Sequence, residues 1–320
     1  MLKKKAENIK KVILGSKLNL EEFVAVVRYN AKVEFSDEYK KRVKKSRKLV
    51  EKWIDEEKVM YGVNTGFGAL HDKVISKEET KKLQENIILS HSTSVGEAMS
   101  EEEVRATMLM VLQNAGQGYS GIRVKILELY RNFLNTNLIP FAPREGSIGY
   151  LSPEAHIAMV VLGKGKAYYN GELLEGKKAL DKIDLKPVNL SSKEGLVLIS
   201  GTTSVTGLGA MALYDIIKAV ESSEIIGALN LEISKGTLKA YDERLMQVRP
   251  HQEQKATAKK IREILSDSEI CQKYLDYRVQ DALSLRCIPQ LHGASKKTLK
   301  DALKTVETEI NSCTDNPIIW

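Results

Sequence analysis

Residues 143–156 read PREGSIGYLSPEAH, and this stretch interrupts a chain that is otherwise mostly typical of helices. Gly146 and Gly149 permit backbone angles that are closed to other residues, so the first half predicts a tight loop. Ser152 and Pro153 are then typical of an N-cap and a first helical residue. A glycine loop that leads into a helix N-terminus suits an anion or a developing negative charge. An ordinary loop-to-helix junction explains the same pattern.

Composition limits the classes of protein to consider. The chain has 320 residues, 42% hydrophobic and 28% charged, which is typical of a globular protein with a large core or two domains. No apolar run approaches the ~20 residues that span a bilayer, and no apolar segment follows the N-terminal lysines, so we expect a cytoplasmic protein. The cysteines are too widely spaced for a metal pair or a disulfide framework, and no metal site is predicted.

The net charge of +7 raises nucleic acid as a partner. The basic residues concentrate in residues 40–52, within a predicted helix that Ser36 and Asp37 cap and that ends near Glu57. Its apolar face follows from residues at three- and four-residue steps, namely Tyr39, Val43, Ser46, Val50 and Trp53. This pattern indicates an amphipathic helix with a solvated basic face. Because aromatic residues are few and no recognition motif is present, we expect neither a nucleic-acid nor a membrane partner.

Helical patterns account for most of the remaining sequence. The helix that we expect at residues 204–234 is apolar almost all round, which predicts that it is buried among other helices. Residues 163–176 predict a short hairpin with an Asn-Gly turn. The predicted helices cover residues 77–92, 101–136 with a break at 116–121, 204–234, 254–265 and 295–312.

Two polar segments between these helices carry candidate functional residues. Residues 59–68 hold three glycines in seven residues and cannot form a helix. Tyr61 directly precedes Gly62 there, so a substrate can approach it closely, although a structural tyrosine is the commoner case. His91 lies near a predicted helix end among small hydroxyl residues. It is either a hydrogen-bonded structural histidine or one that recognises a ligand.

Together these segments resemble the histidine and aromatic amino-acid ammonia-lyases. The resemblance implies a mainly α-helical fold of the ammonia-lyase/fumarase-like superfamily, with a small mixed domain (1–195) that carries the active-site loops and the first part of a long-helix bundle (196–320). It also implies a homotetramer whose sites draw on several subunits. The matching motifs follow the family's order along nearly the whole chain: YGVNTGFG (61–68), Leu83-Gln84 with Ser90-His91, SGIR (120–123), 146–156, Lys193–Leu196 with Gly201-Thr202, Arg249–His251, Gln280–Arg286, Pro289-Gln290 and TDNP (314–317).

The resemblance also implies a chemistry, the removal of ammonia from an α-amino acid. Family members use a methylidene-imidazolone electrophile that forms from an internal Ala-Ser-Gly. By motif match, Tyr61 is similar to the base that takes the β-proton, and Arg286 to the arginine that grips the substrate carboxylate. Gln280 is similar to a polar neighbour in the site. His91 falls where histidine-specific members read the substrate ring, which favours L-histidine as the substrate and urocanate as the product.

The loop after residue 146 departs from the family's pattern, which continues from Gly-Ser-x-Gly to Ala-Ser-Gly and then to aspartate and leucine. Here Gly149 is followed directly by Tyr150, so the tripeptide is missing and Tyr150 stands at the place of the aspartate. A mature chain is written without the tripeptide once it has cyclised, because it is then no longer three standard residues. Alternatively, this homologue lacks the electrophile.

Other departures favour the second explanation. Ser200 stands at the place of an asparagine beside the electrophile, Leu283 at that of a second active-site tyrosine, and Gln113 at that of another asparagine. The family also continues well past TDNP, which implies an incomplete bundle here. The alternative hypothesis is therefore a non-catalytic or subunit-like homologue that binds an amino acid or a partner chain. Ending on Ile318-Ile319-Trp320 is unusual for a free terminus, which predicts that these apolar residues pack against something or that the sequence stops short of a natural boundary.

Overall fold

The computed structural model describes residues 2, 5–66, 75, 77–146 and 151–320. These residues form two compact units. The larger unit comprises Leu2–Met211 and Val306–Trp320, and the smaller unit comprises Ala212–Thr305. The fold is mainly helical, as the sequence predicts. The division into domains at residues 195 and 196 stays a prediction.

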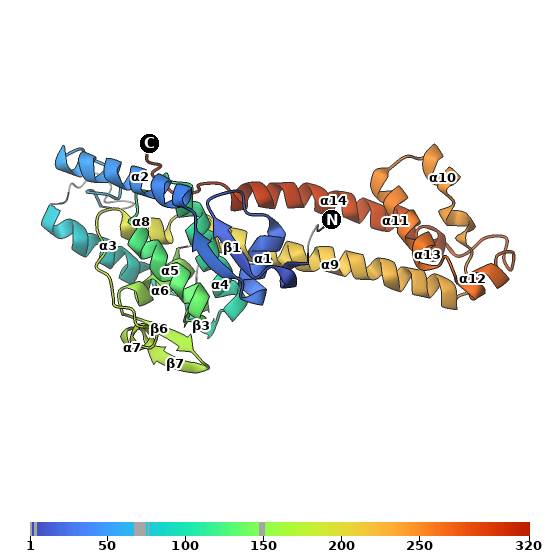
Figure 1. Cartoon of the computed structure of the whole chain (residues 1–320), viewed down its shortest axis with the longest axis horizontal. Coiled ribbons are helices and arrows are strands. Elements are labelled where there is room, and N and C mark those ends of the chain that lie inside the picture. Colours follow the sequence, from blue (N-terminus) through green and yellow to red (C-terminus); the bar gives the residue numbers. More distant parts are fainter. Residues whose placement is uncertain (1, 3–4, 67–74, 76, 147–150) are drawn as a thin grey trace. The chain divides into compact units, whose positions relative to one another are not determined.

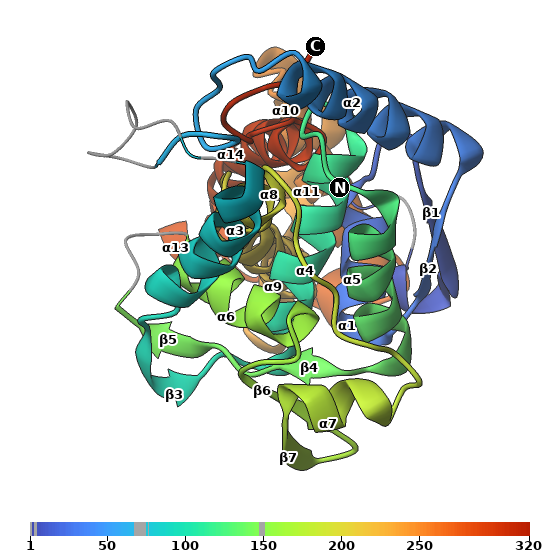
Figure 2. The same ribbon diagram turned by 90° about the vertical axis from the view of Figure 1, so that its left-hand side faces the viewer.

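Helix α4 (Glu101–Gly116) lies at the centre of the larger unit, where every residue from Val104 to Gly116 is buried. Ser100 begins it with a capping box, in which its hydroxyl accepts from the Glu103 amide and the Glu103 carboxylate accepts from the Ser100 amide. Neighbouring helices pack around α4 (Figure 2). They are α1 (Leu20–Tyr29), α2 (Asp37–Asp55), α5 (Val124–Thr136) and α6 (Ser152–Val161).

Short strands complete the larger unit. β1 and β2 pair in parallel across α1, and β3 pairs antiparallel with β5. β6 lies between β4 and β7 in an antiparallel sheet, and the β6–β7 hairpin turns through Asn170 and Gly171, both at positive φ, as predicted. The bounds are β1 Lys11–Leu14, β2 Lys32–Phe35, β3 Val95–Ala98, β4 Ile139–Pro140, β5 Pro143–Glu145, β6 Lys166–Tyr169 and β7 Glu172–Glu175, followed by α7 Gly176–Asp181.

The returning segment Val306–Trp320 is fastened to the start of the chain. The side-chain amide of Asn311 bonds to both backbone groups of Leu18, with Oδ1 2.7 Å from the amide nitrogen and Nδ2 2.8 Å from the carbonyl oxygen. Ile319 is buried against Val50 and Val63, whereas Ile318 is 38% and Trp320 82% exposed, so only one of the three terminal apolar residues packs as predicted.

The smaller unit consists of helices. The parts of α9 (Thr203–Ile233) and α14 (Ile288–Ile310) that belong to it run side by side (Figure 1). Glu224 of α9 is completely buried and is paired with Lys260 at 3.0 Å, with Lys296 of α14, and with the hydroxyl of Thr257 at 2.7 Å. The other helices are α10 (Glu243–Val248), α11 (Gln252–Ile264), α12 (Glu269–Lys273) and α13 (Leu283–Arg286).

The structure corrects the expectation for the apolar helix. α9 spans nearly the predicted residues, but it is not buried all round, because several of its apolar side chains are exposed to solvent. Its exposed apolar residues are Val205, Ile216, Ile225, Ile226, Leu229 and Ile233. The stretch Glu194–Ile233 also has the length and hydropathy of a membrane span, although no uninterrupted apolar run in the sequence predicts one. Since 67% of its apolar window is buried in the protein, a core helix accounts for this composition.

Helix boundaries show two further differences. α14 begins at Ile288 rather than near residue 295, because Pro289 fits the first turn of a helix. Ser152 is not the N-cap of α6. Leu151 occupies that position at φ 80°, and the Ser152 hydroxyl accepts instead from the amides of Thr93 and Ser94. By contrast, Ser36 caps α2 as predicted.

Candidate functional site

The Tyr61 turn is held by its own side chains. Tyr61 is 38% exposed. Asn64 clamps the turn from within, because its Oδ1 accepts from the Met60 amide at 2.8 Å and its Nδ2 donates to the Lys58 carbonyl at 2.8 Å. Val63 anchors it to the core. The structure therefore presents the phenol of Tyr61 on a fixed, partly accessible turn.

Gln84 connects this turn to two helices. It lies on α3 (Lys77–His91) and is completely buried. Its Nε2 donates to the carbonyl of Gly62 at 3.3 Å, and its Oε1 accepts from the amides of Gly195 and Leu196 at 2.9 and 3.3 Å. Those two residues lie in the first turn of α8 (Glu194–Ile199). One side chain thus joins the Tyr61 turn, α3 and α8.

Ser200 follows α8 directly and is 8% exposed. Its Oγ accepts from the amide of Asn316 at 3.2 Å. On the other side of α8, Lys193 pairs with Asp315 at 2.8 Å. The TDNP segment therefore fixes both ends of α8 and the predicted site residue Ser200.

His91 ends α3. Its Nδ1 lies 2.8 Å from the carbonyl oxygen of Ile87, which can only accept, so Nδ1 carries the hydrogen. If only Nδ1 carries a hydrogen, Nε2 can act as an acceptor. Just beyond His91, the hydroxyls of Ser94 and Ser152 lie 2.6 Å apart. The end of α3 is thereby joined to the start of α6.

Glu154, in the first turn of α6, joins that helix to α9. Its Oε1 accepts from the Thr203 hydroxyl at 2.7 Å and from the Ser204 amide at 2.9 Å. The carboxylate thus satisfies one backbone donor in the first turn of α9, the Ser204 amide. Sequence reasoning missed Glu154, although an acidic residue inside an apolar helix was a visible signal.

Two buried ionic contacts that hold the site residues in place were also not predicted from the sequence. Glu194 accepts from the guanidinium of Arg123 and raises its pKa, and the same carboxylate lies 3.8 Å from Arg47. Lys193 and Asp315 form the second contact. The signal in the sequence was the two charged residues, Lys193 and Glu194, that directly precede the apolar run 195–199. Buried charges need partners, but only the folded structure shows which residues those partners are.

Gln280 and Arg286 line one cavity of about 330 Å³ in the smaller unit. The Nε of Arg286 and the Oε1 of Gln290 are buried without a partner among the described residues. The lining of the cavity therefore includes one donor and one acceptor that a ligand can bond to. Leu283 is 63% exposed and does not line the cavity. The structure thus brings Gln280 and Arg286 together. Tyr61, His91 and Ser200 belong to the other unit.

Gly149 and Tyr150 lie outside the described residues. The 320 residues contain no Ala-Ser-Gly at any position. The residues present therefore do not supply a methylidene-imidazolone by the family's route. Within the described part of the chain, no group of three or more His, Cys, Asp and Glu side chains is placed to hold a metal ion.

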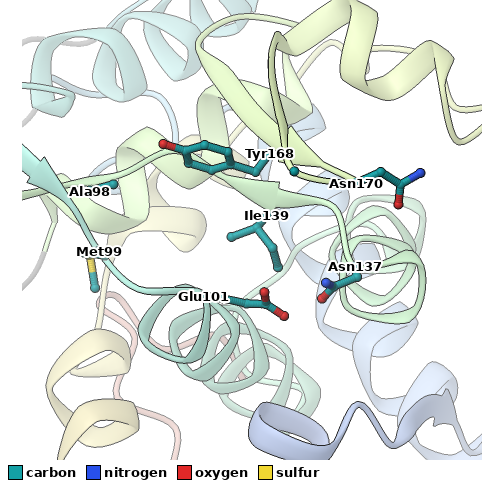
Figure 3. Close-up of a pocket in the computed structure, with 8 residues that line it drawn as sticks. Ala98, Met99, Glu101, Asn137, Ile139, Tyr168 and Asn170 are labelled. Carbon is teal, nitrogen blue, oxygen red and sulfur yellow. The ribbon is translucent and has the colours of Figure 1, made fainter.

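A second cavity, of about 380 Å³, lies in the larger unit and contains none of the predicted residues. The ring of Tyr168 lies over Ile139, and the side chains of Glu101 and Asn137 lie near each other beneath it (Figure 3). Its lining residues are Ala98, Met99, Glu101, Asn137, Ile139, Tyr168, Asn170 and Gly171. Nothing in the sequence singled out this cavity.

The profile of the family described as aromatic amino acid lyase matches residues 18–320. The chain belongs to the aromatic amino acid lyase family. Members of this family are carbon–nitrogen lyases, so the predicted enzyme class is confirmed at the level of the family.

Curated relatives of this lyase-family chain carry the name histidine ammonia-lyase. The protein from Streptococcus sanguinis is 46% identical over 95% of this chain and 60% of its own length. That from Alkaliphilus metalliredigens is 43% identical over 98% of this chain and 62% of its own length. The chain thus spans about three fifths of the curated relatives that it matches.

Solved structures confirm the fold class. The phenylalanine aminomutase of Pantoea agglomerans has a TM-score of 0.91 and 33% identity, covering 97% of this chain and 64% of its own. The histidine ammonia-lyase of Trypanosoma cruzi has a TM-score of 0.87 and 31% identity, covering 97% and 59%. These relatives share the ammonia-lyase and aminomutase fold.

Proposed function

We propose that this lyase-family chain acts on L-histidine, removing ammonia to give urocanate. The observation that carries the proposal is the contact of His91 Nδ1 with the Ile87 carbonyl oxygen at 2.8 Å. This contact occupies Nδ1 and leaves Nε2 as the ring nitrogen that can meet a substrate imidazole. The 40–46% identity to several histidine ammonia-lyases supports the same substrate.

Two further residues have roles in this proposal. Arg286 binds the substrate carboxylate, since this residue lines a cavity and its Nε has no partner among the described residues. Tyr61 takes the β-proton from its fixed turn. The family's electrophile would activate the amine as a leaving group, and it has to be present between Gly149 and Tyr150 for the lyase step.

A second candidate function is favoured by the missing tripeptide. A homologue without the electrophile retains the amino-acid contacts but does not break the carbon–nitrogen bond. It binds an amino acid, or it serves as a subunit beside a partner chain. Ser200 and Leu283, which replace hydrogen-bonding residues of the family pattern, also support this alternative.

The mass of tryptic peptide 145–164, measured together with an assay of histidine turnover, separates the two functions. The lyase proposal expects a peptide heavier than its written residues by one doubly dehydrated Ala-Ser-Gly, and ammonia release at the rate of urocanate formation. If the peptide has only the mass of its written residues and histidine is not consumed, the second function holds. Calorimetric binding of L-histidine then distinguishes an amino-acid binder from a subunit that binds no amino acid.

We also propose that the protein assembles into a homo-oligomer, a tetramer by the resemblance, or with a partner chain. The exposed apolar residues of α9 support this, because Ile225, Ile226 and Leu229 are all more than half exposed in one chain. Light scattering after size-exclusion chromatography tests it. A monomer at micromolar concentration contradicts self-assembly and leaves the partner chain to be sought by co-purification.

A further inference from the structure

The proposed function assigns no role to Gln84. The side chain lines neither of the two cavities described above, yet it bonds to the residue next to Tyr61. We propose that Gln84 is a positioning residue, which holds the Tyr61 turn at a fixed distance from α8. The catalytic consequence rests on the proposed role of Tyr61 as base, whereas the positioning itself does not.

The two ends of the Gln84 amide have different tasks. Oε1 accepts from the amides of Gly195 and Leu196, which have no intrahelical partner because they lie in the first turn of α8. The N-cap of α8, Lys193, makes no side-chain cap bond, so Gln84 provides the cap from another helix. Nε2 meanwhile donates to the Gly62 carbonyl. The orientation of the amide is fixed, since only Nε2 can donate.

Because α3 and α8 are closely packed, no other side chain among the residues that the structure describes has room to bond to both α8 and the Gly62 carbonyl. A Cβ added at Gly195 would lie 2.3 Å from the backbone oxygen of Gln84 and 2.8 Å from Ile87 Cγ2. The two backbones are therefore in direct contact, and residue 84 reaches both partners only with a side chain of this length. Asparagine is one methylene shorter. Glutamate has the right length and two acceptors, but it has no hydrogen for Gly62 when ionised.

This difference provides a selective variant. Gln84→Glu retains the acceptor for α8, where a negative charge at the N-terminus is favourable, and loses the donor to the Tyr61 turn. Gln84→Met loses both. Hydrogen exchange measured by mass spectrometry on segments 59–66 and 194–200 reads the two attachments separately, whether or not the protein turns over histidine.

We expect Gln84→Glu to speed exchange in segment 59–66 about tenfold at neutral pH, the effect of losing one hydrogen bond, while segment 194–200 exchanges as in the wild type. Gln84→Met is expected to speed both. Gln272→Glu, the same change at an exposed position of the smaller unit, serves as the matched control and is expected to alter neither.

Protonation provides a rescue that a purely space-filling role would not show. The ionised carboxylate introduced by Gln84→Glu cannot donate, but its protonated form can, so lowering the pH restores a donor for the Gly62 carbonyl. After correction for intrinsic exchange rates, segment 59–66 of Gln84→Glu is then expected to return towards the wild-type value. If histidine is a substrate, kcat at neutral pH is expected to fall about tenfold or more, with KM changed less than about twofold.

Unchanged exchange of segment 59–66 in Gln84→Glu overturns the positioning role, even if histidine turnover is lost. Equal acceleration of both segments in that variant also overturns it, because the change would then be general loosening. Selective exchange with no histidine turnover in the wild type retains the positioning role and contradicts the proposed function instead. Should Gln84→Met fail to fold, Gln84→Glu alone decides.

Discussion

Lys193 and Asp315 form an ion pair with Nζ and Oδ2 2.8 Å apart, and neither side chain has any exposed surface. The two residues are 122 positions apart and join the start of α8 to the TDNP segment. A buried pair is weak evidence for stability by itself, because desolvation offsets the attraction. Its loss on one side is costly, since a single charge then remains buried.

The first prediction therefore concerns single and double changes of this pair. Lys193→Met is expected to reduce the free energy of unfolding by about 3–5 kcal/mol, because Asp315 is left uncompensated. The double variant Lys193→Met/Asp315→Leu is expected to recover part of that loss. Urea unfolding of the four proteins of the cycle measures this. A double variant as unstable as the sum of both single changes would show that the pair has no coupling energy.

His156 predicts a pH dependence of stability. It is buried on α6, its Nε2 has no partner among the described residues, and burial lowers its pKa below the usual value. Between the two pKa values, the unfolded chain therefore binds a proton at His156 that the folded chain does not bind. The stabilisation is complete above about pH 6.5 and is lost as the pH falls through the lower folded pKa.

His156→Gln is accordingly expected to reduce the fall in unfolding free energy between pH 7.5 and 5.5, by at most about 1.4 kcal/mol per pH unit. Denaturant titrations at both pH values measure it. A residual slope is expected from His292, whose pKa burial also lowers. An identical pH profile for wild type and variant would exclude a contribution from His156.

Tyr61→Phe tests the proposed base. The hydroxyl is lost while the ring and the turn remain, so we expect urocanate formation to fall by at least about a hundredfold with an unchanged circular dichroism spectrum. Tyr119→Phe, at a comparably exposed tyrosine outside the proposed site, is the control. A wild-type rate in Tyr61→Phe would remove this residue from the mechanism.

Arg286→Lys tests the carboxylate contact. Lysine keeps the charge but not the planar fork, so affinity for L-histidine is expected to fall about tenfold. Titration calorimetry measures it independently of turnover, which matters if the electrophile is absent. Arg244→Lys on the exposed surface is the control. Equal affinities of wild type and Arg286→Lys would exclude the contact.

Local sequence signals predicted much of the fold. Ser36 caps α2 because its hydroxyl bonds three residues ahead, and Asn170-Gly171 makes the hairpin because both tolerate positive φ. The same local argument was wrong for Ser152. Its hydroxyl partners lie 58 and 59 residues away, and no nearby pattern records them.

The candidate site shows the same limit. Gln280 and Arg286 are close in sequence, so their shared cavity follows from one short segment. The connection of the Tyr61 turn to α8 depends on Gln84, whose partners come from two distant segments and are defined only after folding. The exposure of Ile225 and Ile226 was also hidden, because a sequence shows that a surface is apolar but not what covers it.

The hydrogen bonds between Leu18 and Asn311 affect how this protein folds during its synthesis. Partners 293 residues apart cannot meet until the later one has left the exit tunnel, so the first helices emerge long before the unit that they belong to can close. During that interval the faces that will receive Asn311 and Ile319 are open to solvent and to other nascent chains. We therefore expect slow maturation and dependence on chaperones, in contrast to a domain whose segments fold in the order of their synthesis.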